Sequence, residues 1–106
     1  MTYCVVYVTA PTGAKAKSIA RVLVRDRLAA CVNIVPSVNS VYRWKGKIES
    51  AREALLVVKT RRSLLPRLAK RVRAVHPYAV PEIVALPLMF GEKSYLRWLD
   101  AETRDR

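Results

Sequence analysis

The chain has 106 residues, 52% of them hydrophobic, and its 20 Lys and Arg outnumber its 8 Asp and Glu to give a formal net charge of +12. This length fits a single domain over residues 1–106, and the hydrophobic fraction excludes a disordered tail. The 3 Gly exclude a Gly-rich phosphate loop, and no apolar run approaches the about 20 residues of a membrane-spanning helix. The N-terminal residues lack the pattern of a signal peptide, so we expect a cytoplasmic protein.

The first elements expected along the chain are a strand and a helix. Residues 3–10 are rich in Val and Tyr and are followed by a Pro-Thr-Gly turn, which is typical of a strand. Apolar residues then recur at helical spacing, and basic residues occupy the other face. The apolar positions of this helix are Ala16, Ile19, Ala20 and Leu23.

A strand and a hairpin are expected next. Residues 31–35 predict a second strand that Pro36 and Ser37 close, and residues 38–44 are again strand-like. Gly46 lies between two lysines and indicates the tip of a hairpin. The return strand is expected through residues 54–59.

The second half predicts a helix, a strand and a short final helix. Ser63 is expected to cap the helix, with Pro66 in its first turn and Pro77 ending it. The apolar stripe of this helix consists of Leu65, Leu68, Ala69 and Val72. Residues 83–90 predict a strand whose proline indicates an edge position or a bulge, and Ser94 opens the last helix.

This order of elements is that of an α+β, ferredoxin-like domain, with a short C-terminal helix appended. Right-handed crossovers would place both main helices on one face of an antiparallel sheet and leave the other face open. Residues 3–8, 54–58 and 83–86 are apolar on both faces of their strands, whereas a half-buried strand alternates. Because soluble monomers rarely expose a large apolar face, we expect a homo-oligomer.

The two cysteines, Cys4 and Cys31, both lie within apolar, strand-like runs. Two cysteines are too few for a disulfide framework. We expect reduced thiols that are buried as small apolar residues. A disulfide between the two is the alternative, which the reducing cytosol disfavours.

Five segments carry a resemblance to a known family. They are Ala-Cys-Val-Asn-Ile at 30–34, Val-Tyr-Arg-Trp-Lys-Gly-Lys-Ile-Glu at 41–49, Leu-Leu-Val-Val-Lys-Thr at 55–60, His-Pro-Tyr-Ala-Val-Pro-Glu-Ile at 76–83 and Tyr-Leu-Arg-Trp-Leu at 95–99. With these segments the chain resembles the divalent-cation tolerance protein CutA family over nearly its whole length. The resemblance implies a ferredoxin-like homotrimer that is associated with tolerance to divalent cations and with binding of copper or a similar metal, with no required cofactor.

The resemblance also points to a metal site. In some members of the family this site uses a Cys near the end of the first strand and paired His residues before a Pro-Tyr. The matching positions here are Val8, Val75 and His76, so His76 is the candidate metal ligand. Since the chain has 1 His, a site with several His would need symmetry copies. The alternative is a structural imidazole at the end of the second helix, where the helix dipole favours its charged form.

A second group of residues is a candidate ligand site: Tyr42, Trp44, Lys59, Tyr78 and Glu82. The resemblance implies that they line a cleft between subunits, and aromatic walls with a few charges suit a small ligand. In the alternative interpretation Tyr42 and Trp44 anchor the subunit interface, and Lys59 pairs with Glu82.

Catalysis is not expected. The sequence has no nucleophile elbow, its thiols are expected to be buried, and the loop after the first strand lacks the Arg on which acylphosphatases, another ferredoxin-like family, depend. The basic helices would attract polyanions in a salt-dependent manner. Because the aromatic stacking motif of RNA-recognition domains is absent, such nucleic-acid binding would be non-specific.

Together with the resemblance, these observations lead us to expect a non-enzymatic homotrimer that binds a divalent metal weakly or transiently in the response to metal ions. The second hypothesis is a trimeric receptor for a small ligand in the intersubunit cleft, which signals to an unknown protein partner. Non-specific nucleic-acid binding is the third hypothesis, and no association with membranes is expected.

Overall fold

The protein is described by a computed structural model that covers residues 2–103. The elements along the chain are β1 (Tyr3–Ala10), α1 (Ala14–Arg25), β2 (Cys31–Trp44), β3 (Lys47–Arg61), the 3-10 turn η1 (Arg62–Leu64), α2 (Leu65–Val75), β4 (Ile83–Pro87) and α3 (Lys93–Glu102). The strands form one antiparallel sheet in the order β2-β3-β1-β4, which confirms the predicted α+β order. Of the predicted domain, Met1 and residues 104–106 lie outside the described residues.

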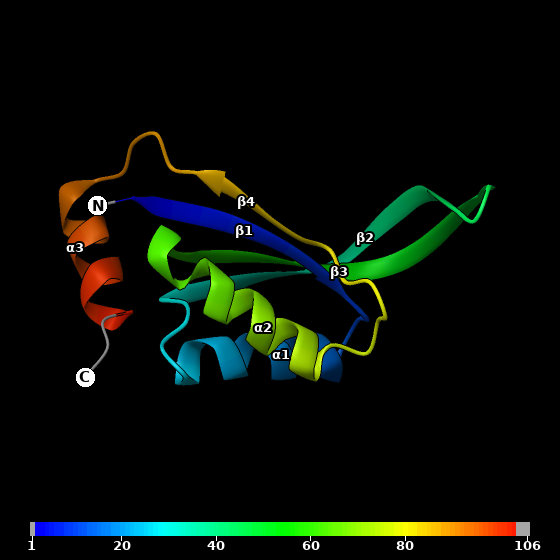
Figure 1. The fold of residues 1–106 in the computed structure, drawn as a ribbon, viewed down its shortest axis with the longest axis horizontal. Helices are drawn as coiled ribbons and strands as arrows, with labels where there is room; N and C mark the ends of the chain where they lie inside the picture. The colour runs from blue at the N-terminus through cyan, green and yellow to red at the C-terminus, as the bar shows by residue number, and fades with distance from the viewer. Residues whose placement is uncertain (1, 104–106) are drawn as a thin grey trace.

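The hydrophobic core lies between the sheet and the helices α1 and α2, which Figure 1 shows on the same side of the sheet. Side chains alternate along a strand, so Val6, Val8, Leu56 and Val58 are fully buried in this core while their neighbours point to the other face. The stripe predicted for the first helix is the face that α1 buries. Both main helices therefore cover one face of the sheet, as predicted.

The opposite face of the sheet is covered by neither α1 nor α2. Register places Tyr7 of β1 beside Val57 of β3 and Val84 of β4 on this face. Tyr7, Val84 and Leu86 remain 37%, 48% and 46% exposed there. The apolar residues that the sequence places on both sides of these strands thus fill the core on one side and form an open apolar surface on the other.

β2 and β3 are longer than predicted and leave the sheet together as a two-stranded arm (Figure 1). The prediction that Pro36 and Ser37 close the second strand is wrong, because β2 continues to Trp44. Instead, its pairing with β3 shifts register between Val35 and Val38. A bulge accommodates the proline here because β2 is an edge strand, so the missing N–H breaks no bond to a further strand.

The arm reverses direction at Lys45 and Gly46, which confirms the predicted hairpin tip. Both residues have positive φ angles, 51° and 81°, as a tight two-residue hairpin turn requires. The strands pair up to the turn, since Trp44 is opposite Lys47. β3 therefore begins at Lys47, earlier than the predicted return strand.

α2 begins differently from the prediction. Ser63 does not cap it but lies in η1, and the N-cap is Leu64, which makes no capping hydrogen bond through its side chain. The reason is that the chain passes from β3 directly into a 3-10 turn that leads into the helix. Pro66 lies in the first turn, and the helix ends before the extended residue His76 that precedes Pro77, both as predicted.

β4 is shorter than predicted because it ends at Pro87. It is an edge strand, which is one of the two positions predicted for a strand that contains proline. α3 begins at Lys93, one residue before Ser94, with Glu92 as its N-cap. Within residues 2–103, no helix combines the length and the apolar character that crossing a membrane requires.

Arg61 and Thr103 attach α3 to the end of β3. Thr103 is fully buried, and its hydroxyl donates to the carbonyl oxygen of Leu99 at 2.8 Å. Arg61 donates from Nε to the hydroxyl oxygen of Thr103 at 2.9 Å and from Nη2 to the Thr103 carbonyl at 2.6 Å. The Thr103 hydroxyl therefore satisfies a charged donor and a helix carbonyl at the same time.

We expect Thr103→Val to lower the free energy of unfolding by about 1–3 kcal/mol, because the isosteric side chain leaves a charged donor without this acceptor. Denaturant unfolding of both proteins at one chain concentration would measure the difference. Thr12→Val is the control, since Thr12 is exposed in a turn, and it should change the midpoint little. Equal midpoints for Thr103→Val and the unmodified protein would contradict the role of this contact.

Candidate functional site

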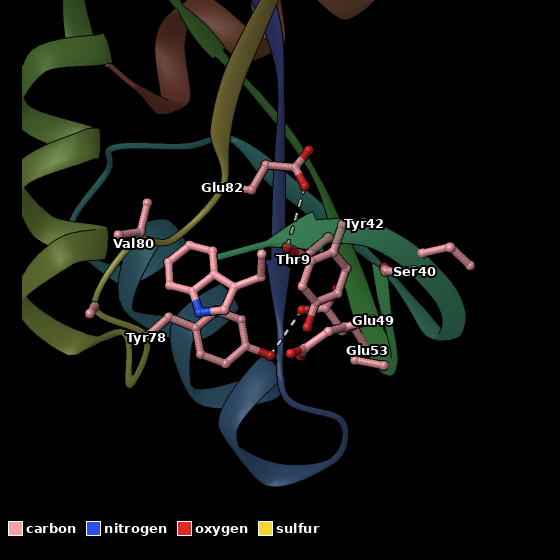
Figure 2. Close-up of a pocket in the computed structure, with 12 residues that line it drawn as sticks. Thr9, Ser40, Tyr42, Glu49, Glu53, Tyr78, Val80 and Glu82 are labelled. Carbon is pink, nitrogen blue, oxygen red and sulfur yellow. Dashed lines mark hydrogen bonds between the residues drawn. The ribbon is translucent and has the colours of Figure 1, made fainter. Parts of the chain in front are cut away.

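An open pocket of about 700 Å³ lies at the base of the β2–β3 arm. Four segments build it: the end of β1, the two strands of the arm, and the loop between α2 and β4 (Figure 2). The lining residues are Thr9, Ser40, Val41, Tyr42, Trp44, Glu49, Ala51, Glu53, Tyr78, Ala79, Val80 and Glu82. Three aromatic rings and three carboxylates are among them.

The bulge in β2 decides which side chains of the arm face this pocket. Up to the bulge, Val35 pairs with Leu55, so odd-numbered residues of both strands share the open face of the sheet. Beyond the bulge Tyr42 pairs with Glu49, so even-numbered residues of β2 now lie on that face. As a result Trp44 joins the carboxylates of β3, and the pocket continues the open face.

Tyr78 reaches into the pocket from the α2–β4 loop and contacts the arm. Its hydroxyl donates to Oε2 of Glu53 at 2.9 Å, the contact drawn in Figure 2. Glu53 is only 7% exposed. Burial above all, and then the hydrogen bond to Glu53 with its charge and the nearby Tyr42, raise the pKa of Tyr78 from 10.0 to about 12. The phenol therefore stays a donor at neutral pH and holds the carboxylate in place.

His76 is the residue that positions this loop. It lies at the C-terminal cap of α2, as predicted, and is buried. Its Nδ1 accepts the backbone N–H of Tyr78 at 3.1 Å, and its Nε2 lies 2.7 Å from the carbonyl oxygen of Thr9. Nδ1 therefore acts as an acceptor in the loop, while Nε2 faces a carbonyl oxygen of β1. Both nitrogens are thus engaged, so a metal at His76 would have to replace one of these hydrogen bonds.

The other end of the pocket is formed where the loop meets β1. The hydroxyl of Thr9 donates to Oε1 of Glu82 at 3.4 Å, and Figure 2 shows this pair apart from Tyr78 and Glu53. Two carboxylates of the pocket are therefore oriented by hydroxyl groups of other segments.

The structure brings together four of the five residues predicted for the ligand site, namely Tyr42, Trp44, Tyr78 and Glu82. Lys59 does not line the pocket. It pairs with Val5 of β1, further along β3, and its ammonium group donates to Oδ1 of Asn33 rather than to Glu82. The difference arises because the pocket uses the first half of β3, whereas Lys59 lies near the C-terminal end of that strand. Whether the four residues bind a ligand stays a prediction.

Glu49 and Glu53 are the charged pocket residues that the sequence did not single out. The signal for them lies in the hairpin tip: a two-residue turn at Lys45 and Gly46 places Glu49 opposite Tyr42. Extending the return strand back to this turn would have identified both carboxylates.

The positions matched to the Cys and the first His of the family's metal site face the core. Val8 is fully buried, and Val75 packs against the core as a half-buried residue. Within residues 2–103 no group of three or more His, Cys, Asp or Glu side chains is close enough to hold a metal ion.

Both cysteines are free thiols. Cys4 is buried, as predicted, and burial raises the pKa of its thiol, which disfavours the reactive thiolate. The prediction of burial is wrong for Cys31, which is only half-buried because it lies on the edge strand β2.

The sequence model of one family, described as "CutA1 divalent ion tolerance protein", matches residues 4–102. Over 99 residues the chain is 52% identical to the "Divalent-cation tolerance protein CutA" of Thermus thermophilus. This alignment covers 93% of this chain and 96% of that protein. It is also 52% identical over 101 residues to "Protein CutA, chloroplastic" of Arabidopsis thaliana, but it spans only 56% of that protein.

Solved structures agree with these sequence matches. The divalent cation tolerance protein of Thermus thermophilus superposes with a TM-score of 0.94 at 51% identity, covering 96% of this chain and 99% of that one. CutA1 from Oryza sativa superposes with a TM-score of 0.96 at 47% identity, covering 100% and 97%.

Alkaline titration of the phenolate absorbance, with Tyr78→Phe for assignment, tests the raised pKa of Tyr78. The raised pKa means that the folded state holds the Tyr78 proton more tightly than the unfolded state does. The resulting stabilisation is complete below pH 10 and is lost as the pH rises through about 12. We expect a late phenolate step in the unmodified protein that Tyr78→Phe removes. Burial also raises the pKa of Tyr95, so loss of the step in Tyr95→Phe instead would contradict the assignment.

Proposed function

Because this chain belongs to the CutA1 divalent ion tolerance protein family, we propose that it acts in the response to divalent metal ions by binding an ion such as copper weakly or transiently. The observation that carries the proposal is the family match over residues 4–102. The pocket supports it, because Glu49, Glu53 and Glu82 form a negatively charged region in a chain of net charge +12. Two of these carboxylates already accept hydrogen bonds from hydroxyl groups. A metal ion would compete with these contacts, so we expect its binding to be weak.

The proposed assembly is a homotrimer. Its support is the apolar face that α1 and α2 leave uncovered, on which Tyr7, Val84 and Leu86 remain partly exposed. Burying such a face against other copies of the chain would release about 25 cal/mol for each Å² of apolar surface removed from water. The pocket continues the same face, so an assembly that buries it would place the pocket beside a neighbouring subunit.

We expect sedimentation at micromolar concentration to report the mass of three 12.0 kDa chains. Leu86→Asp should shift this mass toward that of one chain, because a buried carboxylate without a partner opposes association. Val24→Asp is the matched control, since Val24 is 43% exposed but lies on α1, away from the open face. A single-chain mass for the unmodified protein would overturn the trimer.

Substoichiometric Cu(II) should broaden the amide NMR signals around Glu49 and Glu82 before those elsewhere in the protein. Glu49→Gln or Glu82→Gln should weaken this binding roughly thirty-fold, because each removes about 2 kcal/mol of attraction between a solvated carboxylate and a doubly charged ion at about 4 Å. Glu102→Gln, which removes an exposed charge at the end of α3, is the control. Uniform broadening over the whole protein would reject metal binding in the pocket.

A second candidate function is a trimeric receptor for a small ligand that signals to another protein. The specific observation in its favour is the volume of the pocket, about 700 Å³ with walls that include Tyr42, Trp44 and Tyr78. This volume lies in the range of small-molecule sites.

We propose the cytoplasm as the compartment of the protein, although the Arabidopsis relative carries a chloroplast designation in its name.

A further inference from the structure

The side chains that line the pocket carry a charge opposite to that of the whole chain. The chain contains 20 Lys and Arg, and among the described residues none of these lines the pocket, whereas three of its eight acidic residues do. Strand alternation produces this separation, since Arg43 and Arg52 lie between pocket-facing residues of the arm and therefore point to its other face. The pocket consequently disfavours phosphates and other anions, for which it offers no basic side chain.

The walls of the pocket suit a cation in a second way. Tyr42, Trp44 and Tyr78 present aromatic rings, and Tyr42 and Trp44 are still 42% and 45% exposed. The face of an aromatic ring attracts a cation, and Trp does so most strongly. The chain itself gives an example, because Nζ of Lys45 lies 6.0 Å from the centre of the Trp44 ring.

Glu53 adds a negative charge from a largely buried residue of the arm. It is 7% exposed, and Tyr78 is the one hydrogen-bond donor to its carboxylate found within residues 2–103. A single hydrogen bond leaves the charge of a carboxylate only partly compensated, since two oxygens can accept several donors. A ligand with a positive charge would compensate the rest.

The wide spacing of these carboxylates offers no tight coordination site for a metal ion and leaves room for a larger cation. The carboxylates of the described residues do not come together as a metal-binding group, and a pocket of about 700 Å³ is far larger than a metal ion needs. Negative charges spread over such a volume, between aromatic rings, match a cation whose charge is carried by an organic body.

We infer that the pocket binds a small organic ammonium cation, whose charged group lies against the rings of Tyr42 and Trp44 while Glu49, Glu53 and Glu82 balance its charge. This inference rests on the second candidate function, the small-ligand receptor, and specifies the class of its ligand. It is independent of whether the protein also binds a metal.

The test compares two probes of the same shape on the full chain, choline and its uncharged isostere 3,3-dimethylbutan-1-ol. The readout is the indole N–H resonance of Trp44, assigned with Trp44→Phe, while Trp98 on α3 serves as the internal reference. We expect choline to shift the Trp44 resonance saturably and the isostere to bind about two- to thirty-fold more weakly, because a cation–π contact is worth about 0.5–2 kcal/mol. Trp98 should not respond.

Substitutions of single carboxylates then test which residues balance the positive charge of choline. Glu49→Gln and Glu82→Gln should each weaken choline binding about two- to five-fold, and Glu102→Gln should leave it unchanged. Equal binding of choline and its isostere, or no response of Trp44 to choline, overturns the inference. Trp44 would also fail to respond to choline if a neighbouring copy of the chain filled the pocket, and this outcome likewise overturns the inference.

Two further titrations distinguish rejection of the ammonium site from rejection of the proposed receptor or metal function. If adenosine monophosphate shifts Trp44 and choline does not, the receptor function stands and the ligand class is wrong. If Cu(II) broadens the pocket signals and choline has no effect, the metal function stands and the ammonium site is rejected.

Discussion

The antiparallel pairing of β2 with β3, including its one-residue bulge, is the interaction on which the rest of the structure depends. A strand that pairs without a bulge keeps its odd and even residues on fixed faces. The shift between Val35 and Val38 exchanges these faces in β2 but not in β3. Without it, Tyr42 and Trp44 would lie on the opposite face of the arm from Glu49 and Glu53. The aromatic rings and the carboxylates share one pocket because Pro36 and Ser37 interrupt the ladder.

The loop that completes the pocket is held by hydrogen bonds rather than by packing alone. His76 connects the end of α2 to β1 through the carbonyl of Thr9 and fixes the backbone of Tyr78. Tyr78 in turn holds Glu53 on the arm. The one histidine of the chain therefore holds the α2–β4 loop in place. A metal bound at its ring would compete with the hydrogen bonds that shape the pocket.

The open sheet face and the pocket belong to one continuous surface, which links assembly to binding. Tyr7, Val57 and Val84 form the apolar part of this surface, and the arm extends it beyond the edge of the sheet (Figure 1). In the proposed trimer, a neighbouring subunit would lie beside the pocket. Occupancy of the pocket and packing of the subunits would then influence each other through shared contacts.

Local periodicity in the sequence determined the order of the elements, the buried stripe of α1, the end of α2 before Pro77 and the apolar character of both sheet faces. These features depend on neighbours within a few residues, so spacing alone reports them. The sequence also identified Tyr42, Trp44, Tyr78 and Glu82, through motifs that resemble a family. Only the tertiary structure decided that Glu49 and Glu53 join them, that Lys59 does not, and that both nitrogens of His76 are engaged. Each of these depends on which residues of distant strands are paired, and a shift of one residue in that pairing reverses the face on which a side chain lies.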